Sequence, residues 1–87
     1  MNTEKILRNY LDENQKVTTW PSKPSKQLVI LQHLAEQFEA DKFYTEKEVN
    51  ELLNQHHTFE DPALLRRELF SRKFLGREED CTKYWKI

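Results

Sequence analysis

The chain has 87 residues, a length that suits one small domain. Of these residues, 37% are hydrophobic, 33% are charged and 11% are aromatic, which is too apolar for a chain that stays disordered. No apolar run approaches the roughly 18–20 residues of a membrane span, and no secretory signal pattern is present. The single cysteine excludes an internal disulfide and a cysteine-rich zinc site. We therefore expect a cytoplasmic protein that does not insert into membranes.

Charge is unevenly distributed, although the formal net charge is only −1. Residues 1–60 carry 7 Lys/Arg and 10 Asp/Glu, whereas residues 61–87 carry 7 and 5, so the net charge changes from −3 to +2. A mildly basic C-terminal third is compatible with a nucleic-acid partner, but so small an excess does not identify one. The single glycine argues against a phosphate-cradling loop.

The first 19 residues are predicted to form an appendage to the main domain. The apolar positions 6, 7, 10 and 11 fall on one stripe, which predicts a short amphipathic helix over residues 3–12. Residues 15–20 include three β-branched side chains and precede a proline, which favours extended backbone. A turn with two prolines at 21–25 then separates the appendage, residues 1–19, from a domain spanning residues 20–87.

Three further helices are predicted in the domain. Ser25 is expected to cap a helix that runs to about Glu39. Its consecutive apolar residues 28–31 need more cover than one buried stripe provides, either from the 3–12 helix or from a second copy of the chain. Thr45 begins a capping box for a helix at 45–55. Asp61, followed by Pro62, begins a helix that ends near residue 73.

The remaining segments predict a small sheet. Residues 42–44 form a short aromatic strand, and residues 75–78 and 83–87 form a hairpin around a turn at 79–82. Leu75 and either Tyr84 or Trp85 are expected to face the core. The order helix, strand, helix, helix, hairpin indicates a mainly α fold with a small β part. This fold is a winged helix-turn-helix, a three-helix core with a β-hairpin wing, extended here by an N-terminal helix.

Several short motifs occur in an order that is specific to one family. They are WPSK at residues 20–23, LAEQF at 34–38, YTEKEVNE at 44–51, His56 or His57 with Asp61, LRREL at 65–69 and YW at 84–85. On these motifs the chain resembles the bacterial family of domain of unknown function 2087, over residues 20–87. The resemblance implies an association with transcriptional regulators, because relatives often carry the domain behind a helix-turn-helix of the arsenical-resistance-repressor type. This chain has only residues 1–19 in that position.

Duplex DNA is the leading candidate partner. In a winged helix the third helix enters the major groove and the wing contacts the flanking backbone. Burying Leu65 and Leu69 turns Arg66 and Arg67 outward, where an arginine can bond guanine or clamp phosphate. Further candidate DNA contacts are the basic residues at the helix ends and on the wing: Lys23, Lys26, Lys73, Arg77, Lys83 and Lys86.

Acidic residues oppose this hypothesis. Glu68 lies on the same helix, and residues 78–80 place three acids at the tip of the wing. The alternative for Arg66 or Arg67 is an ion pair with the glutamates of helix 45–55, which contributes about 0–1 kcal/mol when exposed.

A protein-interaction or dimerisation module without DNA binding is the alternative function. The candidate partner-binding residues are Ile6, Tyr10 and Leu11 on the N-terminal helix and Phe70 on the third helix. The N-terminal helix has two candidate positions: packed on its own chain or across a homodimer.

No metal, cofactor or catalytic site is predicted. His56 and His57 are adjacent in a loop and match no standard zinc spacing, so we expect one of them to bond Asp61 or nearby backbone instead. Cys81 falls in the predicted wing turn, where no base is near in sequence. We therefore expect no enzymatic activity.

Overall fold

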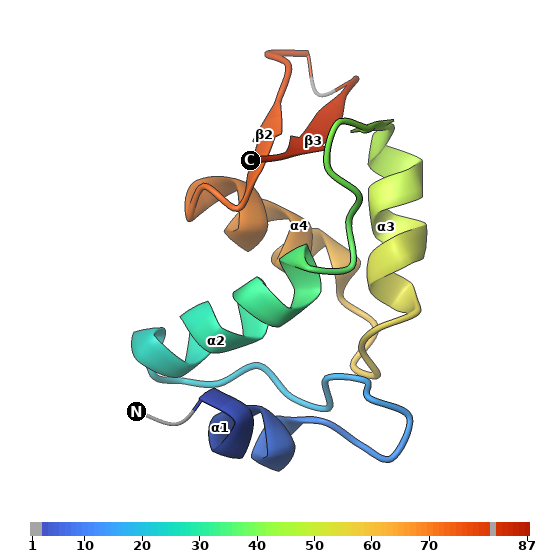
Figure 1. The fold of residues 1–87 in the computed structure, drawn as a ribbon. Coiled ribbons are helices and arrows are strands. Elements are labelled where there is room, and N and C mark those ends of the chain that lie inside the picture. The colour runs from blue at the N-terminus through green and yellow to red at the C-terminus, as the bar shows by residue number, and fades with distance from the viewer. Residues whose placement is uncertain (1–2, 81) are drawn as a thin grey trace.

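Helices and short strands follow one another along the chain in the predicted order. The computed structural model describes residues 3–80 and 82–87, so Cys81 in the predicted wing turn lies outside the described residues. The described elements are, in chain order, α1 (Thr3–Tyr10), α2 (Pro24–Ala35), β1 (Phe43–Tyr44), α3 (Glu46–Asn54), α4 (Pro62–Ser71), β2 (Leu75–Arg77) and β3 (Tyr84–Lys86). Figure 1 shows the sheet at one end of the molecule and α1 at the other, with α2 and α4 between them.

The three strands form one antiparallel sheet in the order β1-β3-β2. Tyr84 of β3 pairs with Tyr44 on one side and Arg77 on the other, while Trp85 pairs with Phe43 and Gly76. Since successive side chains of a strand point to opposite faces, only one of Tyr84 and Trp85 can face the core. Tyr84 is buried and Trp85 is half-buried on the outer face, which settles the alternative that the sequence left open.

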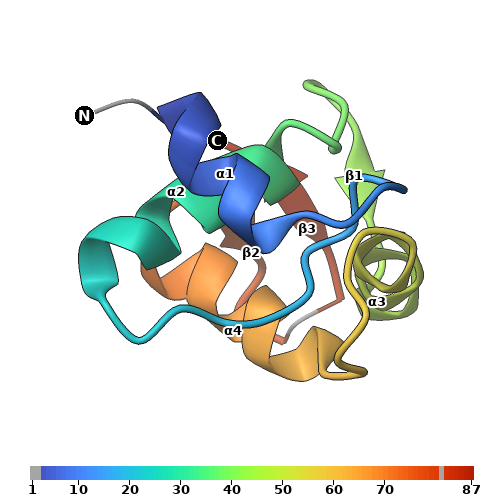
Figure 2. The ribbon, with the colours of Figure 1, turned by 90° about the horizontal axis from the view of Figure 1, so that it is seen from below.

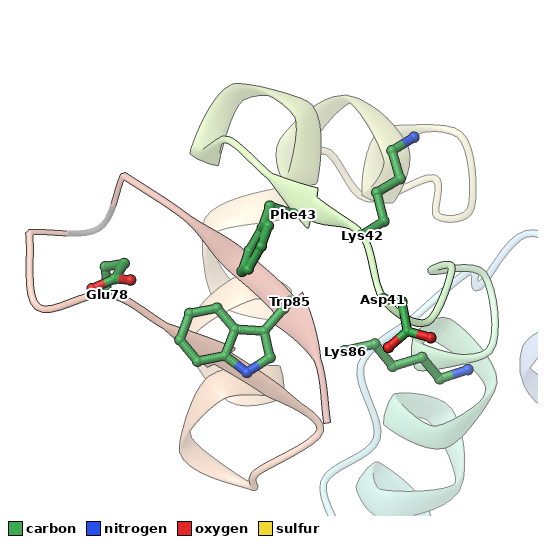
Figure 3. Close-up of a pocket in the computed structure, with 6 residues that line it drawn as sticks. All are labelled: Asp41, Lys42, Phe43, Glu78, Trp85 and Lys86. Carbon is green, nitrogen blue, oxygen red and sulfur yellow. The ribbon is translucent and has the colours of Figure 1, made fainter.

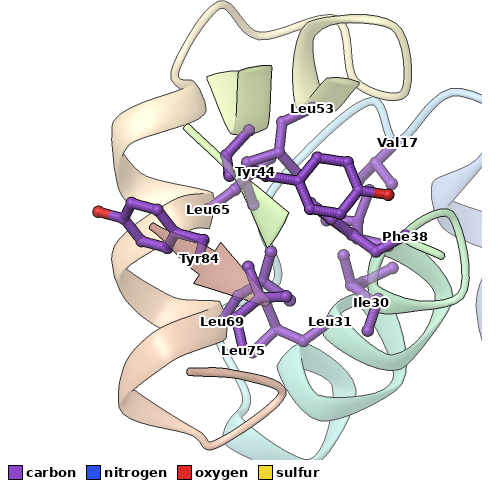
Figure 4. Packing of buried hydrophobic residues seen from close by; sticks show 13 residues of the cluster. Val17, Ile30, Leu31, Phe38, Tyr44, Leu53, Leu65, Leu69, Leu75 and Tyr84 are labelled. Atoms are coloured by element: carbon purple, nitrogen blue, oxygen red, sulfur yellow. The ribbon is translucent and has the colours of Figure 1, made fainter. Parts of the chain in front are cut away.

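The hydrophobic core draws on α2, α3, α4 and all three strands (Figure 4). Val17 joins it from the extended segment before α2, and its side chain is fully buried. The amide of Val17 donates to the His56 carbonyl at 2.8 Å, and its own carbonyl accepts from the Thr58 amide at 2.9 Å. Val17 alone among residues 15–20 forms β-bridges, one with Leu11 and one with His57. The segment is therefore extended at this point without forming a strand.

Helix α2 departs from the prediction at both ends. Lys23 is its N-cap and makes no side-chain capping bond, and Pro24 occupies the first turn. The prediction of Ser25 as the cap is wrong, because the helix already begins at Pro24: proline at the first position has no N–H that needs an acceptor, and its fixed φ suits a helix. The helix ends at Ala35 rather than near Glu39, and turns closed by the amides of residues 36–38 carry the chain on to the buried Phe38.

The predicted starts of α3 and α4 are confirmed. The Glu48 amide donates to Thr45 Oγ1 at 3.1 Å, and Glu48 Oε1 accepts from the Thr45 amide at 2.9 Å. The Thr45 amide, which donates to this carboxylate, and the Thr45 hydroxyl beside it hold the pKa of the Glu48 carboxyl below its ordinary value. Asp61 Oδ1 accepts from the Leu64 amide at 3.1 Å, and Pro62 follows at the first position.

Helix α1 packs on α2 of the same chain, as both views show (Figures 1 and 2). Leu7 and Val29 line one crevice between the two helices, so the predicted cover over α2 is supplied in cis at Val29. Leu28 is left 44% exposed. Within the described part of the chain, no helix is long and apolar enough to cross a membrane.

Candidate nucleic-acid interface

The turn between α3 and α4 is held by one buried histidine. The Nδ1 of His57 lies 2.6 Å from the Leu53 carbonyl and donates to it, because its Nε2 accepts from the Asp61 amide at 3.0 Å. The side chain is only 4% exposed. His57 therefore ties the end of α3 to the cap of α4, which is the structural role predicted for His56 or His57.

The neighbouring His56 is half-buried and plays no such part. Burial lowers the pKa of His56, and the nearby His33 and Lys16 act in the same direction. Among the residues the structure describes, no three histidine, cysteine or acidic side chains gather closely enough to hold a metal ion.

Arg66 is engaged with α3. Its Nη1 donates to Asn50 Oδ1 at 2.5 Å, and its Nη2 lies 3.5 Å from Glu46 Oε1. Only 15% of its side chain is exposed. For this arginine the structure corresponds to the ion-paired alternative, and its guanidinium joins α4 to α3 instead of extending into solvent.

Arg67 is different, although it is the next residue. It is exposed and makes no hydrogen bond or ion pair with any described residue. Phe70 lies three positions further along α4 and therefore on the same face. The guanidinium of Arg77 from β2 stacks over the Phe70 ring, 3.9 Å from its centroid. We call the three residues Arg67, Phe70 and Arg77 the α4 face.

The end of α4 is anchored to the start of α2. Arg72 Nη2 donates to Gln27 Oε1 at 2.6 Å, and Arg72 Nε lies 3.3 Å from Glu68 Oε2. Gln27 Nε2 in turn donates to the Pro21 carbonyl at 2.7 Å. No sequence signal pointed to this link, because its two ends are 45 residues apart.

That link brings three of the predicted lysines to one end of the molecule. Lys23 and Lys26 stand at the start of α2, and Lys73 follows the last turn of α4 in a left-handed backbone conformation with φ 65°. Lys23 and Lys73 are exposed, and Lys26 is half-buried. These lysines extend the positive charge of the α4 face toward α2.

The β2–β3 hairpin, predicted from the sequence as the wing, carries both signs of charge. The Nζ of Lys83 lies 5.4 Å from the centroid of the Phe43 ring on β1, and Lys86 is half-buried at the end of β3. The Asp80 carboxylate accepts from the Thr82 hydroxyl at 2.7 Å and from its amide at 3.1 Å, and these bonds lower the pKa of Asp80. With residues 78 and 79 also exposed and acidic, the tip of the wing is negative.

The side chains predicted to bind a protein partner are mostly packed against other parts of the same chain in this structure. Tyr10 and Leu11 pack against the core, and Ile6 is half-buried on the same helix. Phe70 is half-buried under Arg77.

Comparison with known proteins identifies a family and gives no function. No curated protein and no solved structure matches the chain. One family model matches residues 16–86, and its description reads uncharacterized protein conserved in bacteria, DUF2087. The match includes Val17, which the structure places in the core, and reaches the end of β3. The chain therefore belongs to the DUF2087 family of bacterial proteins.

Proposed function

We propose that this domain is a winged helix-turn-helix that contacts duplex DNA through the α4 face and the lysines beside it. The element order supports the fold: α2, β1, α3, α4 and then a hairpin, with β3 central in the sheet. In such a fold α3 and α4 form the helix-turn-helix, and α4 is the helix presented to the major groove. In Figure 2, α4 lies along the margin of the molecule on the side away from α1.

The observation that carries the proposal is the contrast between Arg66 and Arg67. Arg66 holds α4 against α3, which leaves Arg67 exposed on a helix fixed at both ends by His57 and Arg72. An arginine on a helix held in this way, with no partner among the described residues, is suited to bidentate bonds with guanine or phosphate. Phe70 and Arg77 widen this surface toward β2.

The charges favour weak binding dominated by phosphate contacts. Lys23, Lys26 and Lys73 can approach one stretch of backbone, whereas the acidic wing tip at residues 78–80 repels it. Affinity that depends on a few cations falls steeply with salt, with a slope of about 0.9 per phosphate contact in a plot of log affinity against log salt concentration.

The test uses fluorescence anisotropy of a labelled mixed-sequence duplex across a range of salt concentrations. The variant is Arg67→Ala with Lys73→Ala, which leaves Arg66 and its bonds to α3 intact. The matched control is Arg8→Ala, an exposed arginine on α1. We expect the double variant to lose most of the affinity and to reduce the salt slope by about 1.8, while the control binds as the unchanged protein does.

Two results contradict the proposal. One is the absence of duplex binding by the unchanged protein at low salt. The other is a double variant that remains folded by circular dichroism and binds with unchanged affinity and slope.

A further inference from the structure

The outer face of the sheet carries an exposed aromatic pair. Phe43 on β1 and Trp85 on β3 stand opposite each other in the register, and Phe43 is 63% exposed. Their ring centroids are 6.0 Å apart, and the planes meet at 80°. Figure 3 shows the indole broadside with the phenyl ring edge-on above it, so the two rings form a floor and a wall.

Gly76 allows the indole to lie flat on the sheet. A Cβ at this position would stand 2.4–2.7 Å from three atoms of the indole, so the ring lies directly over the bare backbone of β2. One face of Trp85 is thus supported by the sheet. Over the rings there is a shallow pocket of about 520 Å³, whose rim is formed by Asp41, Lys42, Glu78 and Lys86.

The cations near this pocket are largely engaged by aromatic rings of the protein itself. The Nζ of Lys42 lies 5.0 Å from the centroid of Tyr44, and that of Lys83 lies 5.4 Å from the centroid of Phe43. The acids are not engaged in the same way. Throughout residues 3–80 and 82–87, no ion pair involves Asp41, Glu78 or Glu79, the residue that follows Glu78. The lysines keep their charge over these rings, so the lining holds two carboxylates and two lysines, and with Glu79, Asp80 and Lys83 beside it the surroundings are slightly negative.

We propose that this pocket binds an arginine side chain from a basic, extended segment of a partner protein. The flat guanidinium stacks on the indole of Trp85 against the wall of Phe43, an arrangement that favours arginine among the cations. Asp41 and Glu78 line the pocket on opposite sides of the two rings (Figure 3), so one carboxylate accepts hydrogen bonds from the guanidinium edge and the other attracts a neighbouring basic residue of the segment. The negative wing tip attracts the other basic residues of the segment.

A nucleobase also stacks on an exposed indole, but the charge disfavours that occupant. The phosphates of the strand that carries the base would lie beside Glu78, Glu79 and the Asp80 carboxylate, whose pKa is lowered by the bonds from Thr82. The arginine site uses none of the residues of the α4 face, so either proposal can fail without the other.

The experiment is a titration of the isotope-labelled protein, followed by the indole N–H signals in the amide spectrum. The chain has two tryptophans, and Trp20→Phe assigns the signal of Trp85. The probes are a flexible peptide with three arginines, the same peptide with glutamates, and an oligothymidylate. We expect only the arginine peptide to shift the Trp85 signal. A larger shift with the oligothymidylate, or no shift with the arginine peptide, overturns the proposal.

Three variants separate stacking from charge. Phe43→Ala removes an exposed wall that the core does not require. Asp41→Asn with Glu78→Gln removes the two carboxylates, and we expect it to weaken arginine-peptide binding roughly fivefold, as two exposed charge pairs allow. Glu51→Gln, exposed on α3, is the matched control and leaves the affinity unchanged. If the Phe43 variant and the double carboxylate variant both bind the arginine peptide with the affinity of the unchanged protein, the assignment of the pocket is refuted.

Discussion

Replacing Gly76 by alanine tests whether the indole of Trp85 lies where the structure places it. Gly76 is the only glycine of the chain, and its φ is not in the left-handed region. Its backbone therefore accepts alanine without strain. The obstacle is space: the new Cβ would stand 2.4 Å from Cε2, 2.5 Å from Nε1 and 2.7 Å from Cζ2 of the indole. These distances are too short for a Cβ against a ring atom that it does not bond, so the indole or the strand must move.

The expected cost is the difference of two effects. Overpacking a well-packed site costs about 1–3 kcal/mol. Removing a glycine stabilises the folded state by about 0.5–1 kcal/mol, because the unfolded chain loses conformational freedom. The net loss in the free energy of unfolding is therefore about 0–2.5 kcal/mol. In a domain of this size each kcal/mol lowers the melting temperature by about 4–8 °C.

A double-mutant cycle with Trp85→Val isolates the cause. Chemical unfolding is followed by circular dichroism for the unchanged protein, both single variants and the double variant. Because valine leaves the space above Gly76 open, we expect alanine to cost nothing, or to stabilise slightly, in the valine background. An equal cost in both backgrounds would refute the reasoning, since the penalty would then lie in the backbone rather than in the contact with the indole.

Three further variants test contacts that position α3 and α4. Arg66→Ala removes the bonds to α3, and denaturant unfolding should show a loss of about 1–2 kcal/mol. His57→Ala removes a buried ring and leaves the Asp61 amide without its acceptor, while the Leu53 carbonyl keeps the bond from the His56 amide, so we expect a thermal unfolding loss of about 2–4 kcal/mol. Thr45→Ala removes the cap of α3, at a cost of about 1 kcal/mol. In the same variant the pKa of Glu48 should rise toward its ordinary value in a carboxyl titration by NMR. A lowered carboxyl pKa stabilises the fold above the ordinary pKa, and this contribution is lost as the pH falls through the folded-state value, so the stability difference should shrink below about pH 4.

Each of these variants has a matched control in the chain. Arg67→Ala removes an exposed arginine and should change stability by less than about 0.5 kcal/mol. The ring of His56 makes neither of the two bonds that the ring of His57 makes. His56→Ala should therefore lower the free energy of unfolding far less than His57→Ala does. Thr19→Ala is an exposed threonine that caps no helix, so it should leave the Glu48 titration unchanged. Equal effects in any variant and its control would contradict the contact assigned to that pair.

Local signals determined where α3 and α4 begin. Thr45 and Asp61 each bond an amide three residues ahead, so the information needed to recognise these caps lies within one helical turn. The same reasoning failed at Ser25, because the helix begins at Pro24 with Lys23 as its N-cap, two residues earlier than predicted. The alternation of strand residues reduced the core-facing choice to Tyr84 or Trp85, and the structure then selected Tyr84.

The candidate surfaces were decided by contacts between residues far apart in the sequence. Arg66 and Arg67 are adjacent and chemically identical, and only the position of α3 engages one and leaves the other exposed. Phe43 and Trp85 are 42 positions apart, and the strand register brings them together as a pair. Helix and cap formation depend on neighbours along the chain, so the sequence determined the order of the elements. Which charges remain unpaired, and which rings remain uncovered, depends on how those elements pack, and only the tertiary structure decides that.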